Sequence, residues 1–180
     1  MNCAGALQNS RRDDLEGVHV DGPLALARAC VAVGVRRFVQ ISAAGVEDGP
    51  QAFSRTKRDA DAALRTLDLD WVILRPGLVL APAAFGGSAL LRGLAAFPGV
   101  IPSVYAETVV QVVSVEDVAE AVSRAVAPES PARFTAELVA AEQTTLGEIL
   151  RTLRQWLGYS PAPLLRLPPL IARASAAVAY

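Results

Sequence analysis

Short apolar runs and longer amphipathic stretches alternate along most of the chain. Residues 37–42 and 71–74 are short, apolar and rich in β-branched side chains, which is typical of strands buried in a parallel sheet. Between them, residues 53–67 place apolar side chains at helical spacing, with arginine and aspartate on the opposite face. This order of strand, helix and strand predicts a βαβ unit with two parallel strands.

A first helix is expected before this unit. The acidic pair Asp13-Asp14 suits the positive end of a helix dipole, and Gly34 suits the residue that follows a helix, so the pattern predicts a helix up to about Val33. Gly22-Pro23 lies inside this range, and proline is tolerated best in the first helical turn. We therefore expect a kink, or a later start of the helix near Pro23.

The segment after residue 77 is rich in glycine and proline and contains an apolar helix at about 88–96. Strands are predicted at 109–113 and 134–139, and helices at 115–127 and 146–157. Ser114 stands where the first of these two helices needs a cap, with Asp117 three residues on. Thr145 and Glu148 form the same pattern before the second. The alternation of strands and helices indicates an α/β fold.

Composition and charge narrow the class of protein. The 180 residues suit one compact domain, because 52% are hydrophobic and can bury a sizeable core. A net charge of −1, with acids and bases interspersed, argues against a nucleic-acid or anionic membrane partner. No apolar run approaches the roughly 18 residues of a membrane span. Cys3 and Cys30 are isolated, so we expect reduced thiols, no metal site and a cytoplasmic location.

The candidate chemistry lies where the two predicted parallel strands end. Open parallel sheets bind ligands beyond the carboxyl ends of their strands, and residues 42–45 and 75–77 both follow such ends. Phe53 and Lys57 are four residues apart on the intervening helix and share one face of it. The chain has sixteen arginines and a single lysine, so Lys57 is a candidate binding residue, because the two cations are not interchangeable at a tight site. The alternative is an ordinary solvated lysine.

This order of a strand, a serine, a loop, an aromatic-x-x-x-Lys helix, a strand and Arg75-Pro76-Gly77 resembles the short-chain dehydrogenase/reductase superfamily. More narrowly, it resembles the extended or atypical branch: the NAD-dependent epimerase/dehydratase-like proteins, the NmrA-like proteins and the accessory nucleotide-binding subunit of respiratory complex I. The opening Asn2-Cys3-Ala4-Gly5 is similar to a turn after the family's fourth strand, and Val-Ser-Val-Glu-Asp-Val-Ala at 113–119 also fits. The resemblance covers nearly the whole chain.

The resemblance implies a catalytic site that this sequence retains only in part. In the superfamily a Tyr-x-x-x-Lys pair works with a serine or threonine; the tyrosine transfers the proton, and the lysine lowers its pKa and holds the nicotinamide ribose. Position 53 is phenylalanine, whose ring has no ionisable group and cannot exchange a proton with a substrate. The family's serine or threonine aligns with Ala43, or with Ser42 if the alignment slips by one residue. Lys57 and Ser42 are therefore the candidate catalytic residues.

The resemblance also implies a bound NADP or NAD, with NADP slightly preferred by analogy. The residues that it assigns to the cofactor are Ala4, Gly5, Ser42, Lys57, Pro76, Gly77, Leu78 and Val79. In the family a glycine-rich turn that wraps the pyrophosphate precedes the turn with which this chain begins, so that motif is absent from this sequence. His19, the only histidine, lies near an asparagine that braces the site in many family members, although a lone histidine is more often structural.

These observations predict a partial Rossmann-like, doubly wound parallel sheet without its first strands, together with a small C-terminal lobe. Residues 1–127 would form the C-terminal portion of an NAD(P)-binding domain, and residues 128–180 a small, truncated substrate lobe packed on it. A fragment or mis-started reading frame, a degenerate paralogue and a half-domain completed by a partner are the three explanations, and we favour the first. Each leaves an exposed sheet edge through which the chain could self-associate.

Two functions compete. The first is an NAD(P)-binding oxidoreductase or epimerase of the atypical group that acts on an unknown small molecule and is weakly active or inactive because Phe53 replaces the tyrosine. The second is a non-catalytic accessory or redox-sensing module, in which the dinucleotide is structural or a signal; Phe53 and Ala43 favour it. A truncated product that binds no cofactor alone is a third possibility.

Overall fold

The structure is a computed structural model that describes residues 1–9, 14–84 and 86–168. It divides into two compact units. The first contains Met1–Gly77 and Val113–Val139, and the second contains Leu78–Val112 and the chain from Ala140 onward. The chain therefore crosses between the units more than once, and each unit is built from segments that are distant in the sequence.

A parallel sheet forms the centre of the first unit. It contains β1 (Arg37–Ile41), β2 (Asp70–Pro76) and β7 (Phe134–Leu138), in the order β1-β2-β7. Ile41 is paired with Leu74 in β2, and Pro76 at the end of β2 is paired with Leu138 in β7. On the outer side of β1, Asn2 forms an isolated parallel bridge with Gln40. The carboxyl ends of the strands consequently lie at one edge of the sheet.

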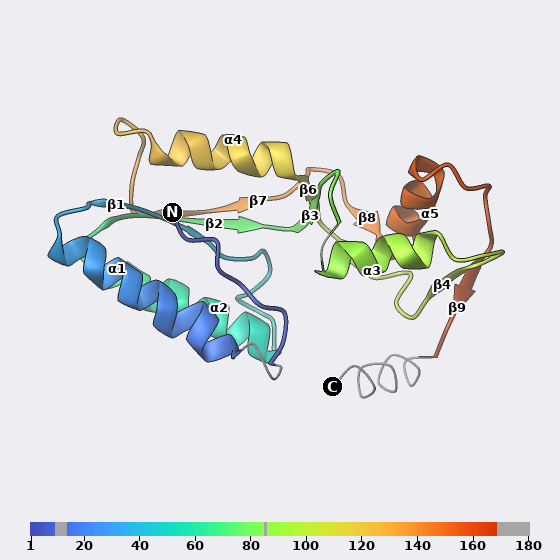
Figure 1. Ribbon diagram of the computed structural model, residues 1–180, viewed down its shortest axis with the longest axis horizontal. Coiled ribbons are helices and arrows are strands. Elements are labelled where there is room, and N and C mark those ends of the chain that lie inside the picture. The colour runs from blue at the N-terminus through green and yellow to red at the C-terminus, as the bar shows by residue number, and fades with distance from the viewer. Residues whose placement is uncertain (10–13, 85, 169–180) are drawn as a thin grey trace. The chain divides into compact units, whose positions relative to one another are not determined.

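Helices cover both faces of this sheet. The residues Gly17–Asp21 form a π-helical segment that leads into α1 (Gly22–Ala32), and α2 (Ala52–Arg65) follows β1. Both lie on one face, and α4 (Val115–Val126) lies on the other (Figure 1). Pro23 lies at the beginning of α1, directly after the π-helical segment, so the chain is already helical where the proline enters. Gly34 follows the helix with a φ of 77°, a conformation that glycine adopts without strain.

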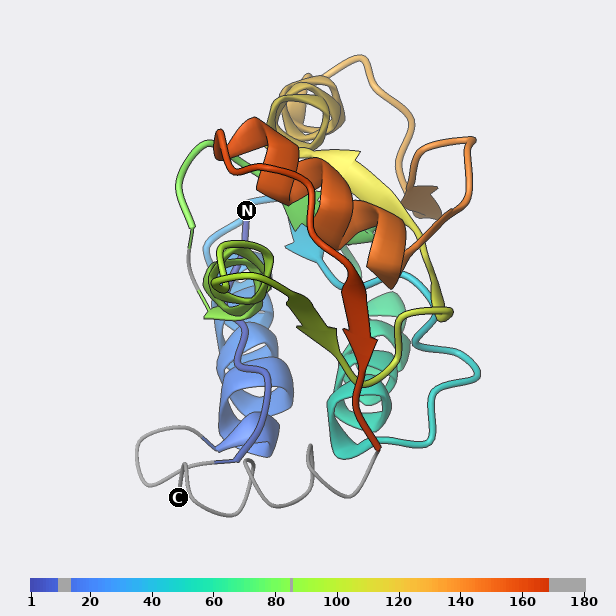
Figure 2. The same ribbon diagram turned by 90° about the vertical axis from the view of Figure 1, so that its right-hand side faces the viewer.

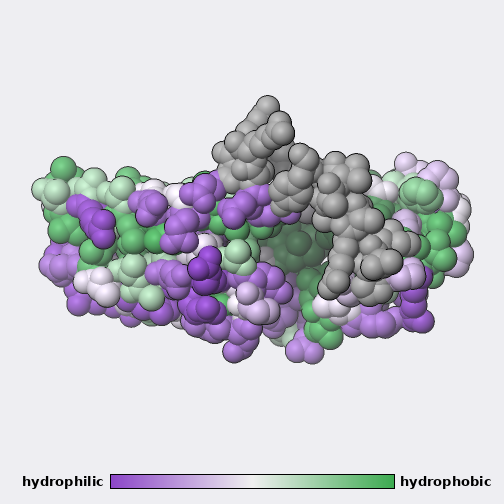
Figure 3. Space-filling view, turned by 90° about the horizontal axis from the view of Figure 1, so that it is seen from below, coloured by the Kyte–Doolittle hydropathy of each residue, from purple (hydrophilic) through white to green (hydrophobic). Residues whose placement is uncertain are grey.

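Successive side chains of each strand point to opposite faces of the sheet, and the helices bury both faces. Phe38 and Ile73 join a core with Ala27 of α1 and Leu64 of α2. Their neighbours Val39, Val72 and Leu74 join a second core with Ala125 of α4. This explains why the strands are apolar throughout rather than alternating in polarity. The outer surface over α1 and α2 mixes hydrophilic and hydrophobic side chains (Figure 3).

The second unit is built around two helices that pack on each other, α3 (Gly86–Ala95) and α5 (Leu146–Trp156). Ala95, Ile101 and Leu150 form its buried core. Its strands are short: β4 (Ile101–Ser103) lies parallel to β9 (Leu164–Arg166), and β5 (Val109–Val110) lies antiparallel to β8 (Thr144–Thr145) (Figure 2). β3 (Leu78–Leu80) belongs to this unit, and β6 (Val112–Ser114) spans the boundary to the first.

The predicted helix caps are present. Thr145 and Glu148 form a complete capping box at the start of α5, and the Ser114 hydroxyl accepts the Asp117 N–H at the start of α4. The strand predicted at 109–113 is instead divided into β5 and β6, with Gln111 between them; its carbonyl accepts the Leu78 N–H. β7 completes the sheet of the first unit, while 78–112 belongs to the second unit.

Candidate functional site

Lys57 lies at the centre of the candidate site, with its side chain buried under the first residues of the chain. It is 5% exposed, and its Nζ atom donates to the carbonyl oxygens of Ala4, at 3.3 Å, and Ile41, at 3.2 Å. Burial lowers the pKa of its ammonium group, and the nearby Asp61 carboxylate partly opposes this shift. Two neutral carbonyl oxygens therefore hold a largely desolvated cation at the carboxyl end of β1.

Residues 2–5 pack closely against this cation because Asn2 anchors them to β1. The Asn2 N–H donates to the Val39 carbonyl, and its side-chain amide donates to Gln40 Oε1. Gly5 follows without a side chain. A Cβ at that position would lie 3.6 Å from Lys57 Nζ and 3.9 Å from His19 Nε2. The absence of a side chain at Gly5 thus leaves room beside both nitrogen atoms.

His19 is completely buried next to Lys57 and is held as a neutral imidazole. Its Nε2 atom accepts the Ala6 N–H at 3.0 Å, so the ring proton must be on Nδ1, which lies 2.7 Å from Thr56 Oγ1. The Thr56 hydroxyl in turn donates to backbone carbonyls one turn earlier in α2. Burial, and then the charge of Lys57, lower the pKa of His19 from 6.5 to about 4.

Phe53 places a hydrocarbon ring at the position where the resemblance implies a phenol. Its ring packs edge-on against His19, with ring centroids 5.3 Å apart and an interplanar angle of 86°. It lies one helical turn before Lys57, as the i, i+4 spacing predicts. The ring therefore occupies the position next to the lysine but contributes packing only.

Ser42 follows β1 and joins a buried network that the sequence did not predict. Its hydroxyl donates to Asp61 Oδ2 at 2.9 Å, and Arg75 donates to the same oxygen through Nε, at 3.0 Å, and Nη2, at 2.8 Å. Arg75 also pairs with Glu47 at 2.6 Å, which lowers the pKa of that carboxyl group. Asp61 is fully buried and its Oδ1 atom has no hydrogen-bond partner in the described part of the chain. The Ser42 hydroxyl is consequently engaged in structure.

The remaining residues predicted to bind the cofactor, at the end of β2 and after it, are divided between the two units. Pro76 ends β2, and its carbonyl accepts the Ala44 N–H at 2.9 Å, which brings the loop after β1 against the bend that begins at Pro76. Gly77 follows and donates to the Leu138 carbonyl of β7. Leu78 and Val79 lie in β3, in the second unit. The structure thus brings Ala4, Gly5, Ser42, Lys57, Pro76 and Gly77 together at one end of the sheet of the first unit.

Three residues that the sequence did not single out as binding or catalytic form buried hydrogen bonds or ion pairs in this region: Asp61, Glu47 and His19. Asp61 lies four residues after Lys57, which places both side chains on one face of α2. A charged Arg75 inside an apolar strand also requires a partner, so the pairing had a signal in the sequence. Among the described residues, no group of three or more histidine, cysteine or acidic side chains could hold a metal ion.

The described helices include none that combines the length and apolar character needed to cross a membrane.

Sequence comparison finds two relatives. The UPF0659 protein YMR090W of Saccharomyces cerevisiae is 37% identical over 68 residues, which cover 33% of this chain and 30% of that protein. Protein fmp-52, mitochondrial, of Neurospora crassa is 36% identical over 99 residues, which cover 51% of this chain and 39% of that protein.

Solved structures share the fold over most of this chain. WbmG of Bordetella bronchiseptica, in complex with NAD, superimposes with a TM-score of 0.72 at 18% identity, covering 92% of this chain and 57% of that one. The UDP-glucose 4-epimerase of Thermus thermophilus, in complex with NAD, superimposes with a TM-score of 0.65 at 22% identity. The match covers 90% of this chain and 65% of that one. The dTDP-glucose 4,6-dehydratase of Bacillus anthracis, also in complex with NAD, superimposes with a TM-score of 0.71 at 17% identity. The match covers 86% of this chain and 56% of that one.

The matched region thus spans less than two thirds of each of these proteins. The structural likeness confirms the predicted Rossmann-like α/β fold. A family model described as NAD(P)H-binding matches residues 5–129, which is more than half of the chain. The chain therefore belongs to this NAD(P)H-binding family and has the fold of the NAD-dependent epimerases and dehydratases.

Proposed function

We propose that the chain binds the nicotinamide half of NADP or NAD at the carboxyl end of β1 and β2, and that Lys57 donates a hydrogen bond to the ribose. Family membership supports the ligand class. The position of Lys57 supports the contact, because its ammonium group lies at this end of the sheet and, among the described residues, donates to two acceptors with three hydrogens. We assign the backbone of Ala4, Gly5, Pro76 and Gly77 to the walls of the pocket.

The proposed site has little capacity for the proton transfer of classical family members. Phe53 carries no hydroxyl, and the Ser42 hydroxyl already donates to the Asp61 carboxylate. Both ring nitrogens of His19 have protein partners, and the low pKa of the ring opposes proton uptake near neutral pH. Weak or absent oxidoreductase or epimerase activity is the consequence that we expect. The replacement of tyrosine by Phe53 carries this proposal.

A non-catalytic accessory or redox-sensing module is the second candidate. The occupied hydroxyl of Ser42 and the hydrocarbon ring of Phe53 favour it, because both remove chemistry while Lys57, the binding residue, remains. Here the bound dinucleotide would stabilise the fold or report the redox state through the difference in affinity between its oxidised and reduced forms. Equal affinity for the two forms would argue against sensing.

Titration with NADPH and NADH, followed by nicotinamide fluorescence, tests the binding and compares the two cofactors. A hydrogen bond from a charged donor contributes about 1.5–3 kcal/mol, so Lys57→Met should weaken binding by about tenfold or more. Arg55→Met is the matched control, because Arg55 is exposed on the same helix. Equal effects of the two substitutions would remove Lys57 from the site, and an absence of binding by the unmodified chain would end the proposal.

Restoring the phenol with Phe53→Tyr distinguishes the two candidates. Carbonyl reduction or sugar-nucleotide epimerisation that appears in this variant would support a recently silenced enzyme, since the new hydroxyl would stand one turn from Lys57. Continued inactivity over carbonyl and sugar-nucleotide panels, with dinucleotide binding retained, would support the accessory module. The substrate, the predicted cytoplasmic location and the domain boundary at residue 127 stay predictions.

Self-association through the outer edge of β1 is a further part of the proposed behaviour. In the described chain, this edge is paired at Asn2, which donates to the Val39 carbonyl and accepts the Ile41 N–H. The backbone groups of Arg37 point to the same side by the alternation of a strand, so a second strand could pair there. Sedimentation velocity over a wide concentration range should show a dimer, and a strictly monomeric chain would refute the idea.

A further inference from the structure

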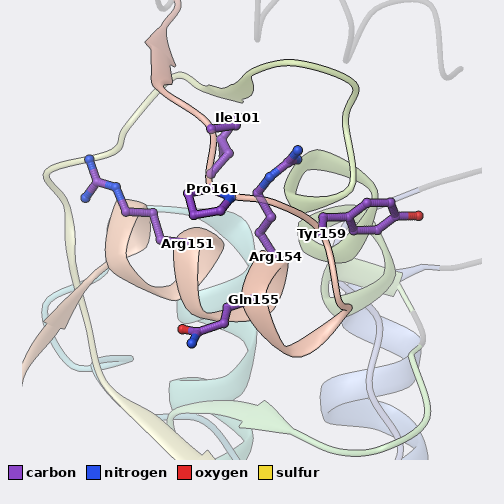
Figure 4. A pocket seen from close by; sticks show the side chains of 7 residues that line it. Ile101, Arg151, Arg154, Gln155, Tyr159 and Pro161 are labelled. Atoms are coloured by element: carbon purple, nitrogen blue, oxygen red, sulfur yellow. The ribbon is translucent and has the colours of Figure 1, made fainter.

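A cavity in the second unit has a chemistry unrelated to the dinucleotide site. Its volume is about 460 Å³, which lies within the range of small-molecule pockets. Part of its wall comes from α5 and the segment that follows it, and the remainder from the start of β4. The lining residues are Ile101, Arg151, Arg154, Gln155, Tyr159, Pro161 and Ala162. The described part of the wall therefore contains two cations, two neutral hydrogen-bonding groups and no acid (Figure 4).

Arg154 is a buried cation without a carboxylate partner in the described part of the chain. It is 7% exposed. Its Nε atom donates to the Ser160 carbonyl at 2.5 Å, and its Nη1 atom donates to the carbonyls of Ala95, at 2.7 Å, and Phe97, at 2.9 Å. These carbonyls belong to the end of α3 and the segment after α5, and they hold the guanidinium in place without neutralising its charge. Its Nη2 atom has no protein acceptor among the described residues.

The remainder of the wall adds to this positive charge. Arg151 lies one turn before Arg154 on α5, and no carboxylate in the described chain comes within ion-pair distance of it. Glu148, the nearest acid on the helix, is occupied by its hydrogen bonds to Thr144 and Thr145. In the view of Figure 4 the two guanidinium groups stand on either side of Ile101 and Pro161. A ligand in the cavity would therefore meet positive charge and an apolar surface together.

We propose that this cavity binds a small oxyanion, a carboxylate or phosphate group carried on a compact apolar body. Arg154 Nη2 and the Arg151 guanidinium are the charged donors, and the Tyr159 ring lies beside the Arg154 guanidinium, with its centroid 5.5 Å from Cζ. Ile101, Pro161 and Ala162 would contact the apolar part. Guanidinium groups match the planar geometry of carboxylate and phosphate oxygens, which is why this lining selects an oxyanion rather than a neutral ligand.

The carbonyl contacts of Arg154 also give it a structural role, because they satisfy the end of α3. That role uses Nε and Nη1 only. It does not explain why Arg151, which forms no ion pair in the described part of the chain, shares the same cavity, or why Nη2 has no acceptor among the described residues. Arg151 is exposed, so its removal tests the ligand site without disturbing these contacts.

The test is an NMR titration of the full chain with inorganic phosphate, acetate and benzoate as separate probes. Chemical-shift changes are expected at the backbone amides of Gly158, Tyr159, Ser160 and Ala162 and at the Arg154 Nε–H. If benzoate binds more tightly than acetate, the ligand is a carboxylate on an apolar body. If phosphate binds more tightly than both, the ligand carries a phosphate group. Either result supports the proposal. The absence of shifts at these positions, or shifts that map elsewhere, would overturn it.

The variant Arg151→Gln should weaken binding by about tenfold while the free protein keeps its spectrum, because one charged donor is lost. Arg28→Gln removes the same charge from an exposed position on α1 and serves as the control. Equal weakening by both would show a general effect of net charge and would also overturn the proposal. Neither substitution touches Lys57, so the outcome is independent of dinucleotide binding.

Discussion

His19 provides a direct test of the buried arrangement around Lys57, because its protonation should oppose folding. The imidazole is fully buried, and burial lowers its pKa from 6.5 to about 4. In the unfolded chain the ordinary pKa returns. Acid therefore protonates the unfolded chain first, so the stabilisation from His19 is complete above pH 6.5 and is lost as the pH falls towards 4.

The magnitude follows from the two pKa values. Each pKa unit corresponds to about 1.4 kcal/mol, so the fall from 6.5 to about 4 corresponds to about 3 kcal/mol of unfolding free energy. About 2 kcal/mol of this should be lost between pH 7 and pH 5. Carboxyl groups also titrate in this range, so the comparison needs a variant that lacks the imidazole. The substitution His19→Gln provides it, because the amide oxygen can still accept the Ala6 N–H.

Two measurements check this prediction. His19 is the only histidine, so its ring resonances are unambiguous in the NMR spectrum; they should show the neutral Nδ1–H form and a midpoint near 4. Urea unfolding, followed by Trp71 in a Trp156→Phe background, should show the stability difference between the chain and His19→Gln narrowing by about 2 kcal/mol from pH 7 to pH 5. A midpoint near 6.5, or a pH-independent difference, would refute the assignment.

Three further outcomes are expected. Replacement of Asp61 by alanine should lower the unfolding free energy by about 3–5 kcal/mol, because it leaves Arg75 as a buried cation with only Glu47 beside it; a loss below 1 kcal/mol in urea unfolding would contradict the paired arrangement. Lys57, as the only lysine, gives one ε-ammonium NMR signal, whose pKa should lie below the ordinary lysine value and fall further in Asp61→Asn; an unshifted titration would exclude its burial. Thr145→Ala should destabilise α5 by about 1 kcal/mol in thermal unfolding, whereas an unchanged Tm would show that the capping box is dispensable.

Local patterns in the sequence were sufficient for most elements of the fold. The apolar runs predicted β1 and β2, and the helical spacing between them predicted α2, which places Phe53 and Lys57 on one face. These patterns could be interpreted because each element buries its own apolar side chains with a period that depends only on its own backbone. The capping box at Thr145 was predictable for the same reason, since all its hydrogen bonds lie within four residues.

The partners of the buried polar groups depended on tertiary structure. Ser42, Asp61 and Arg75 come from the end of a strand, a helix and another strand, and only the packing of α2 on the sheet brings them to a single carboxylate oxygen. The ammonium of Lys57 was recognisable as unusual from composition, but its carbonyl partners at Ala4 and Ile41 are distant in the sequence. The sequence by itself therefore determined the helices, the strands and the residue types at the ends of the strands, through short-range periodicity. The tertiary structure alone decided which side chains are buried and paired, because desolvation and hydrogen bonding depend on neighbours from distant parts of the chain.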